Sequence, residues 1–137
     1  MTAVVYNFCG HRAVIEDQID AVLDQHTNLN YYGFDLELKP YDVQLQRGRD
    51  KMLGYEFTEL VQLCIECINK SIDPNSAHSS IDIVEVVRDW LIQEKGYCRV
   101  NVELHGAVIV AAIILGWSPV GLSPVVSFCE LERRAQR

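Results

Sequence analysis

The chain has 137 residues, of which 49% are hydrophobic, and this length and composition fit one globular domain spanning residues 1–137. The formal net charge is −7, from 12 lysines and arginines against 19 aspartates and glutamates, so unassisted binding to the phosphate backbone of a nucleic acid is not expected. A protein of this charge is better suited to a basic partner.

The cysteines indicate a reducing compartment. They are odd in number in a chain that is too long to need disulfide staples. Residues 1–9 lack the basic region and cleavable apolar segment of a secretory signal. We therefore expect a cytoplasmic protein with free thiols at Cys9, Cys64, Cys67, Cys98 and Cys129.

The first segment predicts a strand followed by a helix. Residues 2–10 are rich in β-branched and aromatic side chains and end at Gly10, which predicts the strand. Residues 11–26 predict an amphipathic helix with two contrasting faces. The apolar face consists of Val14, Ile15, Ile19, Val22 and Leu23. The opposite face is wholly acidic and consists of Glu16, Asp17, Asp20 and Asp24.

The next segment, residues 31–49, alternates apolar and polar side chains on either side of Pro40. This alternation predicts two strands, or one edge strand that the proline interrupts. Arg47, Arg49 and Lys51 follow, without the interleaved aromatic residues of a single-strand nucleic-acid platform. We therefore interpret them as solvated surface.

Two helices are predicted in the middle of the chain, separated by an internal loop at residues 73–80. Residues 55–73 have apolar side chains at helical spacing, with Thr58 as a candidate N-cap. Residues 79–96 begin with a serine N-cap and end at Gly96, which suits the position just after a helix.

An uncharged apolar stretch, residues 106–117, follows a predicted half-buried strand at residues 97–106. Five β-branched residues and the pair His105-Gly106 favour a hairpin, whereas Ala111, Ala112 and Gly116 favour a helix. Both readings stay open, and the balance leans to a helix buried on all sides. The strict apolar run, residues 107–115, is shorter than the ~18 residues that a membrane span needs.

The end of the chain predicts irregular structure, a last short strand at residues 125–129, and a polar basic tail at residues 130–137. The order of elements, with hairpin-like pairs between helices, predicts an α+β fold. We expect a mostly antiparallel sheet of about four to five strands, packed by about three to four helices in a single domain.

One candidate site is a thiol at Cys9. It lies at a predicted strand end just before a helix, where unpaired N–H groups stabilise a thiolate, and His11 is close in sequence as a base. The competing interpretation is that Cys9 is a small buried residue and His11 a solvated one. On the first interpretation the protein is a small enzyme or a ligand-binding protein.

A second candidate site is the pair Cys64 and Cys67, whose spacing places both sulfurs on one helix face and could supply half of a zinc site. A second ligand pair is missing from the sequence, and apolar residues share that face. Core packing is therefore the favoured interpretation, and we expect no metal and no cofactor.

The third candidate is the acidic helix face of Glu16, Asp17, Asp20 and Asp24, with Asp35 and Glu37 on the outward side of a predicted strand. Such charge runs are usually solvated surface, but carboxylates without interleaved lysines repel one another, and a basic partner relieves that repulsion. Our leading hypothesis is a non-catalytic protein of the inhibitor or immunity type that neutralises a basic partner such as a nuclease toxin. Homodimerisation through a sheet edge or residues 120–128 is a further alternative.

Overall fold

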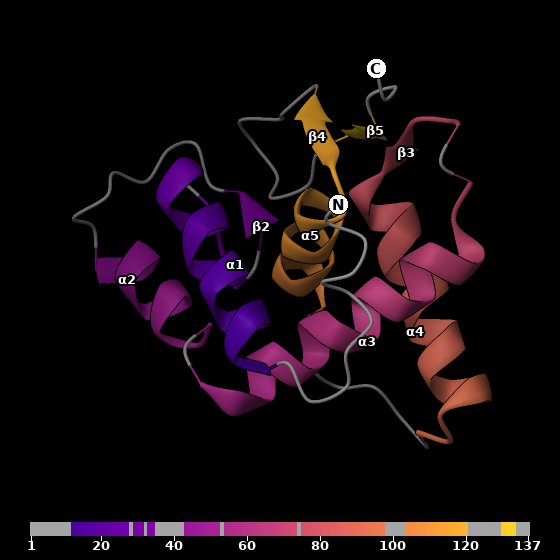
Figure 1. The fold of residues 1–137 in the computed structure, drawn as a ribbon, viewed down its shortest axis with the longest axis horizontal. Helices are drawn as coiled ribbons and strands as arrows, with labels where there is room; N and C mark the ends of the chain where they lie inside the picture. Colours follow the sequence, from indigo (N-terminus) through magenta and orange to yellow (C-terminus); the bar gives the residue numbers. More distant parts are fainter. Residues whose placement is uncertain are drawn as a thin grey trace.

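The computed structural model describes residues 12–27, 29–31, 33–34, 43–52, 54–73, 75–97, 104–120 and 130–133. Helices account for most of these residues, and α5 lies in the middle of the others (Figure 1). Helices α1, α3 and α4 all contact α5. The helices are α1 (Arg12–Gln25), α2 (Val43–Asp50), α3 (Tyr55–Ser71), α4 (Ser80–Glu94) and α5 (His105–Ile114).

The strands are short and form two small antiparallel sheets. Strands β1 (Leu29–Asn30) and β2 (Gly33–Phe34) pair as a hairpin. Strand β5 (Glu130–Arg133) lies between β3 (His78–Ser79) and β4 (Trp117–Val120).

The predicted α+β fold, with a sheet of four to five strands as its main layer, is therefore wrong, because the described part of the chain is mostly helical. One cause is local. Residues 43–50, predicted as part of a strand, form α2, because the good helix formers glutamine, leucine and arginine outweigh two alternating apolar residues. The other cause is that strands of two to four residues bury too little apolar surface to form a layer of the core.

Helix α1 confirms four of the five residues of its predicted apolar face. Ile15, Ile19, Val22 and Leu23 are buried and contribute to the core, and the side chain of Val14 lies outside the described part of the chain. The spacing of these residues turns one side of the helix inward, so the acidic residues between them face outward.

Helix α3 confirms the predicted helix but not its predicted N-cap. Gly54 occupies the N-cap position with φ of 96°, a conformation that suits glycine. Thr58 lies inside the helix, is 1% exposed, and its Oγ1 donates a hydrogen bond of 3.0 Å to the carbonyl of Gly54. A threonine four residues into a helix can satisfy its hydroxyl in this way and remain buried.

Helix α4 confirms both of its predicted ends. The Oγ of Ser79 accepts a hydrogen bond of 3.2 Å from the backbone N–H of Ile81, and Gly96 follows the helix with φ of 76°. The preceding loop is shorter than predicted. His78 and Ser79 pair with β5, and Ser80 already belongs to the helix.

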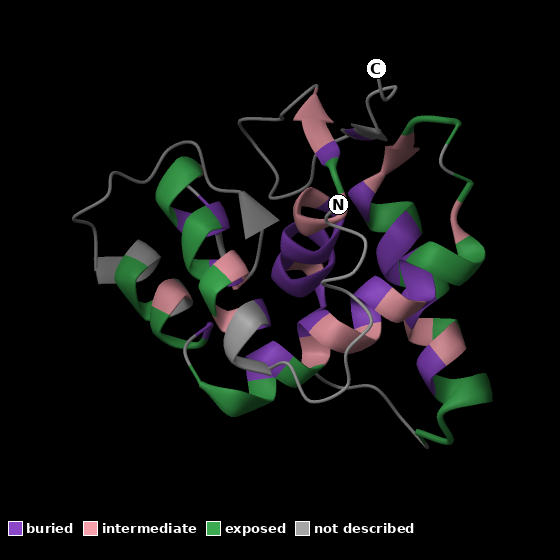
Figure 2. Ribbon diagram, viewed as in Figure 1, coloured by how far each residue is buried: buried purple, intermediate pink, exposed green. Residues whose placement is uncertain are grey.

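Residues 106–114 of the apolar stretch belong to helix α5, as the balance of signals favoured, whereas Trp117 begins β4 and the last two residues of the helix, Ile113 and Ile114, are only partly buried. All seven residues from Gly106 to Ala112 are buried (Figure 2). The N–H of Gly106 donates to the carbonyl of Tyr31 at 3.1 Å, and Gly116 has φ of 98° just after the helix. Within the described ranges, no helix has both the length and the hydropathy that crossing a membrane requires.

The last segment differs from the predicted polar tail. Glu130–Arg133 form β5, the middle strand of its sheet, and Leu131 is 0% exposed. Leu131 therefore packs into the core from a segment that the sequence pattern did not predict as a strand. The predicted strands at residues 2–10 and 125–129 lie outside the described residues, as do residues 134–137 and residues 98–103 of the predicted strand at 97–106. The end of that predicted strand is wrong, because His105 and Gly106 belong to α5.

Candidate functional site

The acidic face of α1 is exposed to solvent. Asp17, Asp20 and Asp24 are exposed and Glu16 is partly exposed. Among the described residues, the ion pairs join Glu66 to two lysines, and none involves a carboxylate of α1. Helix α1 also has no basic residue in its last turn. This face therefore presents carboxylates to solvent outside the described ion pairs, and of its carboxylates Asp24 interacts electrostatically with Arg49.

The other predicted site residues cannot be placed on this surface. Asp35 and Glu37, the predicted extension of the acidic face, lie outside the described residues. Cys9 and His11, the alternative catalytic pair, lie outside them as well.

Arg49 joins α2 to the end of α1. Its guanidinium donates to three backbone carbonyls, with Nε 3.0 Å from the oxygen of Leu29 and one terminal nitrogen 2.9 Å and 2.7 Å from the oxygens of Leu23 and His26. Burial lowers the pKa of Arg49 from its ordinary value, and the nearby carboxylate of Asp24 opposes that shift. Interpreting Arg49 as solvated surface was therefore wrong. The only signal in the sequence was indirect, since α1 ends without a basic residue or a glycine to satisfy its last carbonyls.

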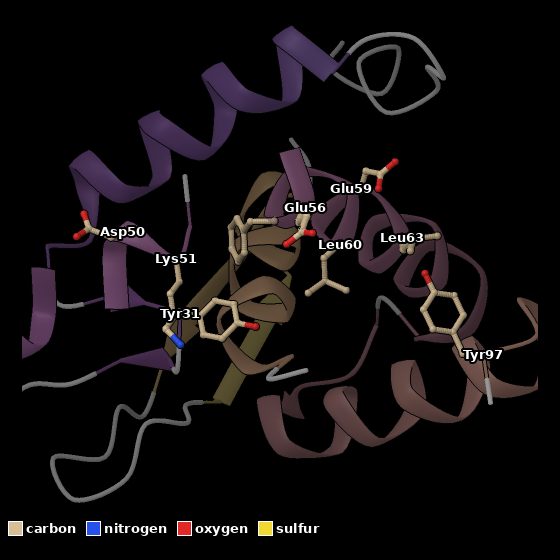
Figure 3. Close-up of a pocket in the computed structure, with 9 residues that line it drawn as sticks. Tyr31, Asp50, Lys51, Glu56, Glu59, Leu60, Leu63 and Tyr97 are labelled. Carbon is tan, nitrogen blue, oxygen red and sulfur yellow. The ribbon is translucent and has the colours of Figure 1, made fainter. Parts of the chain in front are cut away.

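A hollow with a volume of about 560 Å³ lies between the end of α2, one side of α3 and Tyr97, which follows α4 (Figure 3). We call it the acidic groove. It is lined by Tyr31, Asp50, Lys51, Glu56, Phe57, Glu59, Leu60, Leu63 and Tyr97.

The acidic groove combines carboxylates with aromatic rings. Among the described lining residues, three carboxylates accompany one lysine, so this part of the lining carries an excess of negative charge. The rings of Tyr31 and Phe57 contact each other with centroids 6.1 Å apart at 51°. The ammonium of Lys51 lies 5.5 Å from the centroid of Tyr31. Tyr31 and Tyr97 lie toward opposite ends of the groove (Figure 3), and Tyr97 is 43% exposed.

The cysteine pair is buried inside α3. Both Cys64 and Cys67 are 0% exposed, and no group of three or more potential ligands among the described residues could hold a metal ion. Burial raises the pKa of Cys64 well above its ordinary value, and the neighbouring Cys67 adds to the rise. Burial also raises the pKa of Cys67, from 9.0 to about 11. Both thiols are protonated at neutral pH and pack as small apolar groups.

These shifts predict a loss of stability at alkaline pH. Because the folded-state pKa lies above the unfolded value near 9.0, the thiols' contribution is complete below that pH and is lost as the pH rises through about 11 for Cys67. The free energy of unfolding in urea should therefore fall between about pH 9 and about pH 11. The free energy of unfolding should fall less steeply with pH in the double variant Cys64→Ala/Cys67→Ala. Equal dependence on pH in the variant and the unmodified chain would mean that the two thiols do not cause the loss.

Ser80 and His105 form a pair that resembles part of a nucleophilic site. The Oγ of Ser80 lies 2.7 Å from Nε2 of His105, where the first turns of α4 and α5 meet. Ser80 is 0% exposed, so a substrate cannot reach its hydroxyl. The pair therefore fixes the two helix ends relative to each other and is not a catalytic centre.

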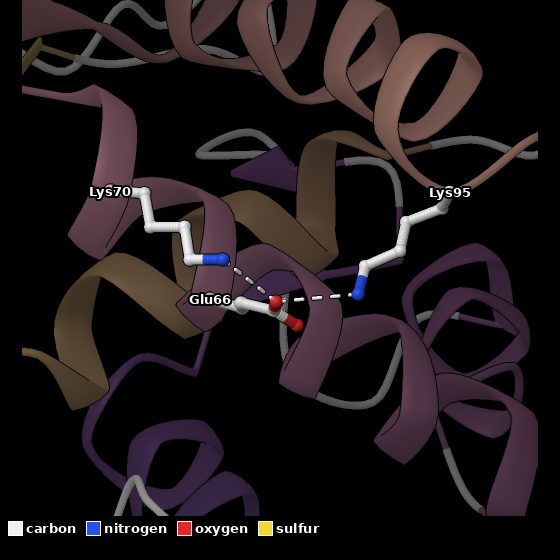
Figure 4. Close-up of polar contacts among 3 residues, drawn as sticks. All are labelled: Glu66, Lys70 and Lys95. Atoms are coloured by element: carbon white, nitrogen blue, oxygen red, sulfur yellow. Dashed lines mark hydrogen bonds and ion pairs between the residues drawn. The ribbon is translucent and has the colours of Figure 1, made fainter.

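A carboxylate on α3 links that helix to the end of α4. Glu66 Oε2 lies 3.3 Å from the ammonium of Lys70 and 3.3 Å from that of Lys95 (Figure 4). All three side chains are more than a third exposed, so solvent screens the pairs and they contribute at most about 1 kcal/mol. This cluster is structural.

The described surface therefore offers acidic features whose chemistry suits binding of positive charge, among them the face of α1 and the acidic groove. Comparisons with protein-family models, with curated proteins and with solved structures find no match to this chain. Function is therefore inferred from the face of α1 and the acidic groove. Sequence reasoning found the first and missed the second, whose residues are dispersed from position 31 to position 97.

Proposed function

We propose that this protein is a small acidic cytoplasmic protein that binds a basic protein partner, as an inhibitor or immunity-type protein does when it neutralises a basic enzyme such as a nuclease toxin. The observation that supports the proposal is the exposure of Asp17, Asp20 and Asp24 along one face of α1. The net charge of −7 agrees with it.

The placement of these carboxylates has an energetic cost that a basic partner removes. Asp17 and Asp20 are three residues apart, and Asp20 and Asp24 are four apart, so each pair repels across one turn by a few tenths of a kcal/mol. Asp24 also lies near the negative end of the helix dipole. A basic surface relieves these repulsions on binding, and the same field accelerates its approach.

The test is charge reversal. The triple variant Asp17→Lys/Asp20→Lys/Asp24→Lys should reduce capture of basic proteins from native cytosol by at least about tenfold at low salt and make the remaining capture less salt-dependent. A matched control reverses three exposed carboxylates of α4, in Glu85→Lys/Asp89→Lys/Glu94→Lys, which changes the net charge equally.

Captured proteins are quantified by mass spectrometry at low and moderate salt, after circular dichroism has established that both variants fold. The control should retain the same basic proteins as the unmodified chain. Equal losses in the two variants would mean that net charge alone drives capture, and unchanged capture in the α1 variant would reject the α1 face.

A further inference from the structure

We propose that the acidic groove receives an arginine side chain from the basic protein partner. This inference rests on the proposed function and deepens it, because it assigns the recognition of one cationic side chain to a hollow separate from the exposed face of α1. The size of the groove, its charge and the position of Lys51 over the Tyr31 ring all suit such a side chain.

The size and lining of the groove suit a long side chain with a charged end. Its volume of about 560 Å³ falls within the roughly 300–1,000 Å³ that is usual for ligand sites. Leu60 and Leu63 are partly buried and supply apolar surface, against which the methylene groups of an arginine can pack. Tyr97 is 43% exposed and supplies an open ring for the guanidinium.

The charge of the groove selects a cation. Asp50, Glu56 and Glu59 outnumber Lys51, so an anionic ligand would be repelled. The hydroxyl of Tyr55 donates a hydrogen bond to Oε2 of Glu59, which holds that carboxylate in one orientation. Carboxylates held in this way pair well with the planar donors of a guanidinium.

Lys51 shows how a cation fits in the groove. Its ammonium lies 5.5 Å from the centroid of the Tyr31 ring, within the distance at which a ring attracts a cation. The ring of Tyr97 lies toward the other end of the groove (Figure 3). An incoming arginine therefore occupies the Tyr97 end, and Lys51 repels it from the Tyr31 end. We favour arginine over lysine because a guanidinium both stacks on an aromatic ring and binds carboxylates through two nitrogens.

The experiment compares two capped peptides that differ only in replacing arginine by citrulline, which has nearly the same shape and no charge. Binding to the full chain is followed by amide chemical shifts in nuclear magnetic resonance spectra. The arginine peptide should shift the amides of residues 56–63 and of Tyr97, and the citrulline peptide should bind at least about tenfold more weakly. Equal binding of the two peptides would overturn the proposal.

Variants locate the site. Glu56→Gln/Glu59→Gln should weaken binding of the arginine peptide by at least about tenfold, whereas Glu85→Gln/Asp89→Asn on α4 should change it by less than about twofold. Tyr97→Leu should weaken it by about threefold or more, since leucine keeps the apolar bulk but loses the ring. Equal effects of the groove and α4 variants would reject the groove.

Removing lysines gives a test that net charge alone does not explain. Lys51→Gln should strengthen binding of the arginine peptide by at least about threefold, because it removes a competing cation from the groove. Lys70→Gln, which removes one positive charge elsewhere on the surface, should have little effect. A similar gain in both variants would contradict the role assigned to Lys51.

The outcomes separate this inference from the proposed function. If the arginine peptide shifts α1 amides alone and only the α1 charge reversal weakens it, the groove is rejected and the proposed function stands. If neither peptide nor basic proteins bind, both fail. If spermidine binds the groove as well as the arginine peptide does, the site is one for free polyamines and the inference is wrong.

Discussion

Replacing Ile109 by alanine is expected to lower the free energy of unfolding by about 3 kcal/mol, the largest effect of a single substitution that we predict. Ile109 is 0% exposed and belongs to α5, which contacts α1, α3 and α4. The surrounding helices cannot all move inward to fill the space that the lost atoms leave. The cost therefore combines the lost burial of apolar atoms with that of a residual cavity.

Urea denaturation measures this loss, and Ile92→Ala provides a matched control. Ile92 is 39% exposed on α4, so the same chemical change there should cost less than about 0.5 kcal/mol. The slope of the unfolding free energy against urea concentration should be the same for both variants and the unmodified chain. Equal slopes mean that the same amount of surface is exposed on unfolding, so the free energies can be compared directly. Similar costs for the two variants would contradict the central position of α5.

Arg49→Ala should lower the free energy of unfolding by about 2–3 kcal/mol. The substitution removes the three hydrogen bonds that the guanidinium donates to the carbonyls of Leu23, His26 and Leu29. Arg49→Lys should recover only part of the loss, because an ammonium lacks the planar fork that reaches carbonyls in three directions.

The matched control lies on the same helix. Arg47 is exposed on α2, two residues before Arg49, and Arg47→Ala should change the free energy of unfolding by less than about 0.5 kcal/mol. Thermal and urea unfolding of the three variants give the comparison. If Arg47→Ala and Arg49→Ala cost the same, the bonds of Arg49 to the carbonyls contribute nothing measurable.

The helices could be predicted where the apolar spacing extends over several turns. Helices α1, α3 and α4 each repeat apolar residues at intervals of three and four, and no strand can bury such a pattern on one face. Helix α5 was harder, since a segment that is apolar on every side has no period to detect. Its burial on contact with α1, α3 and α4 explains why a helix without a polar face is stable there.

The sheet could not be predicted correctly because short alternating patterns are ambiguous. The charged segment Glu130–Arg133, whose Leu131 is buried, becomes a strand because β3 and β4 supply its hydrogen-bond partners. Conversely, Val43 and Leu45 suggested a strand, but the residues around them favour a helix. Partners distant in sequence decide the first case, and local helix propensity decides the second.

The same limit applies to the candidate site. Exposed carboxylates on α1 follow from the helical period of a single segment, so the sequence was sufficient to predict them. The acidic groove brings Tyr31, the end of α2, one side of α3 and Tyr97 together, which only the packing of the helices determines. Arg49 was misjudged for the same reason, because the carbonyls that it binds belong to another part of the chain.

The central position of α5 has a consequence for synthesis on the ribosome. Helices α1, α3 and α4 are translated before α5, so their apolar sides have no common partner until Ile114 has been added. At roughly 5–20 residues per second, translating the stretch from the end of α3 to the end of α5 takes on the order of a few seconds. During that interval the nascent chain exposes apolar surface that chaperones recognise, and a ribosome stalled before His105 holds a fragment prone to aggregation.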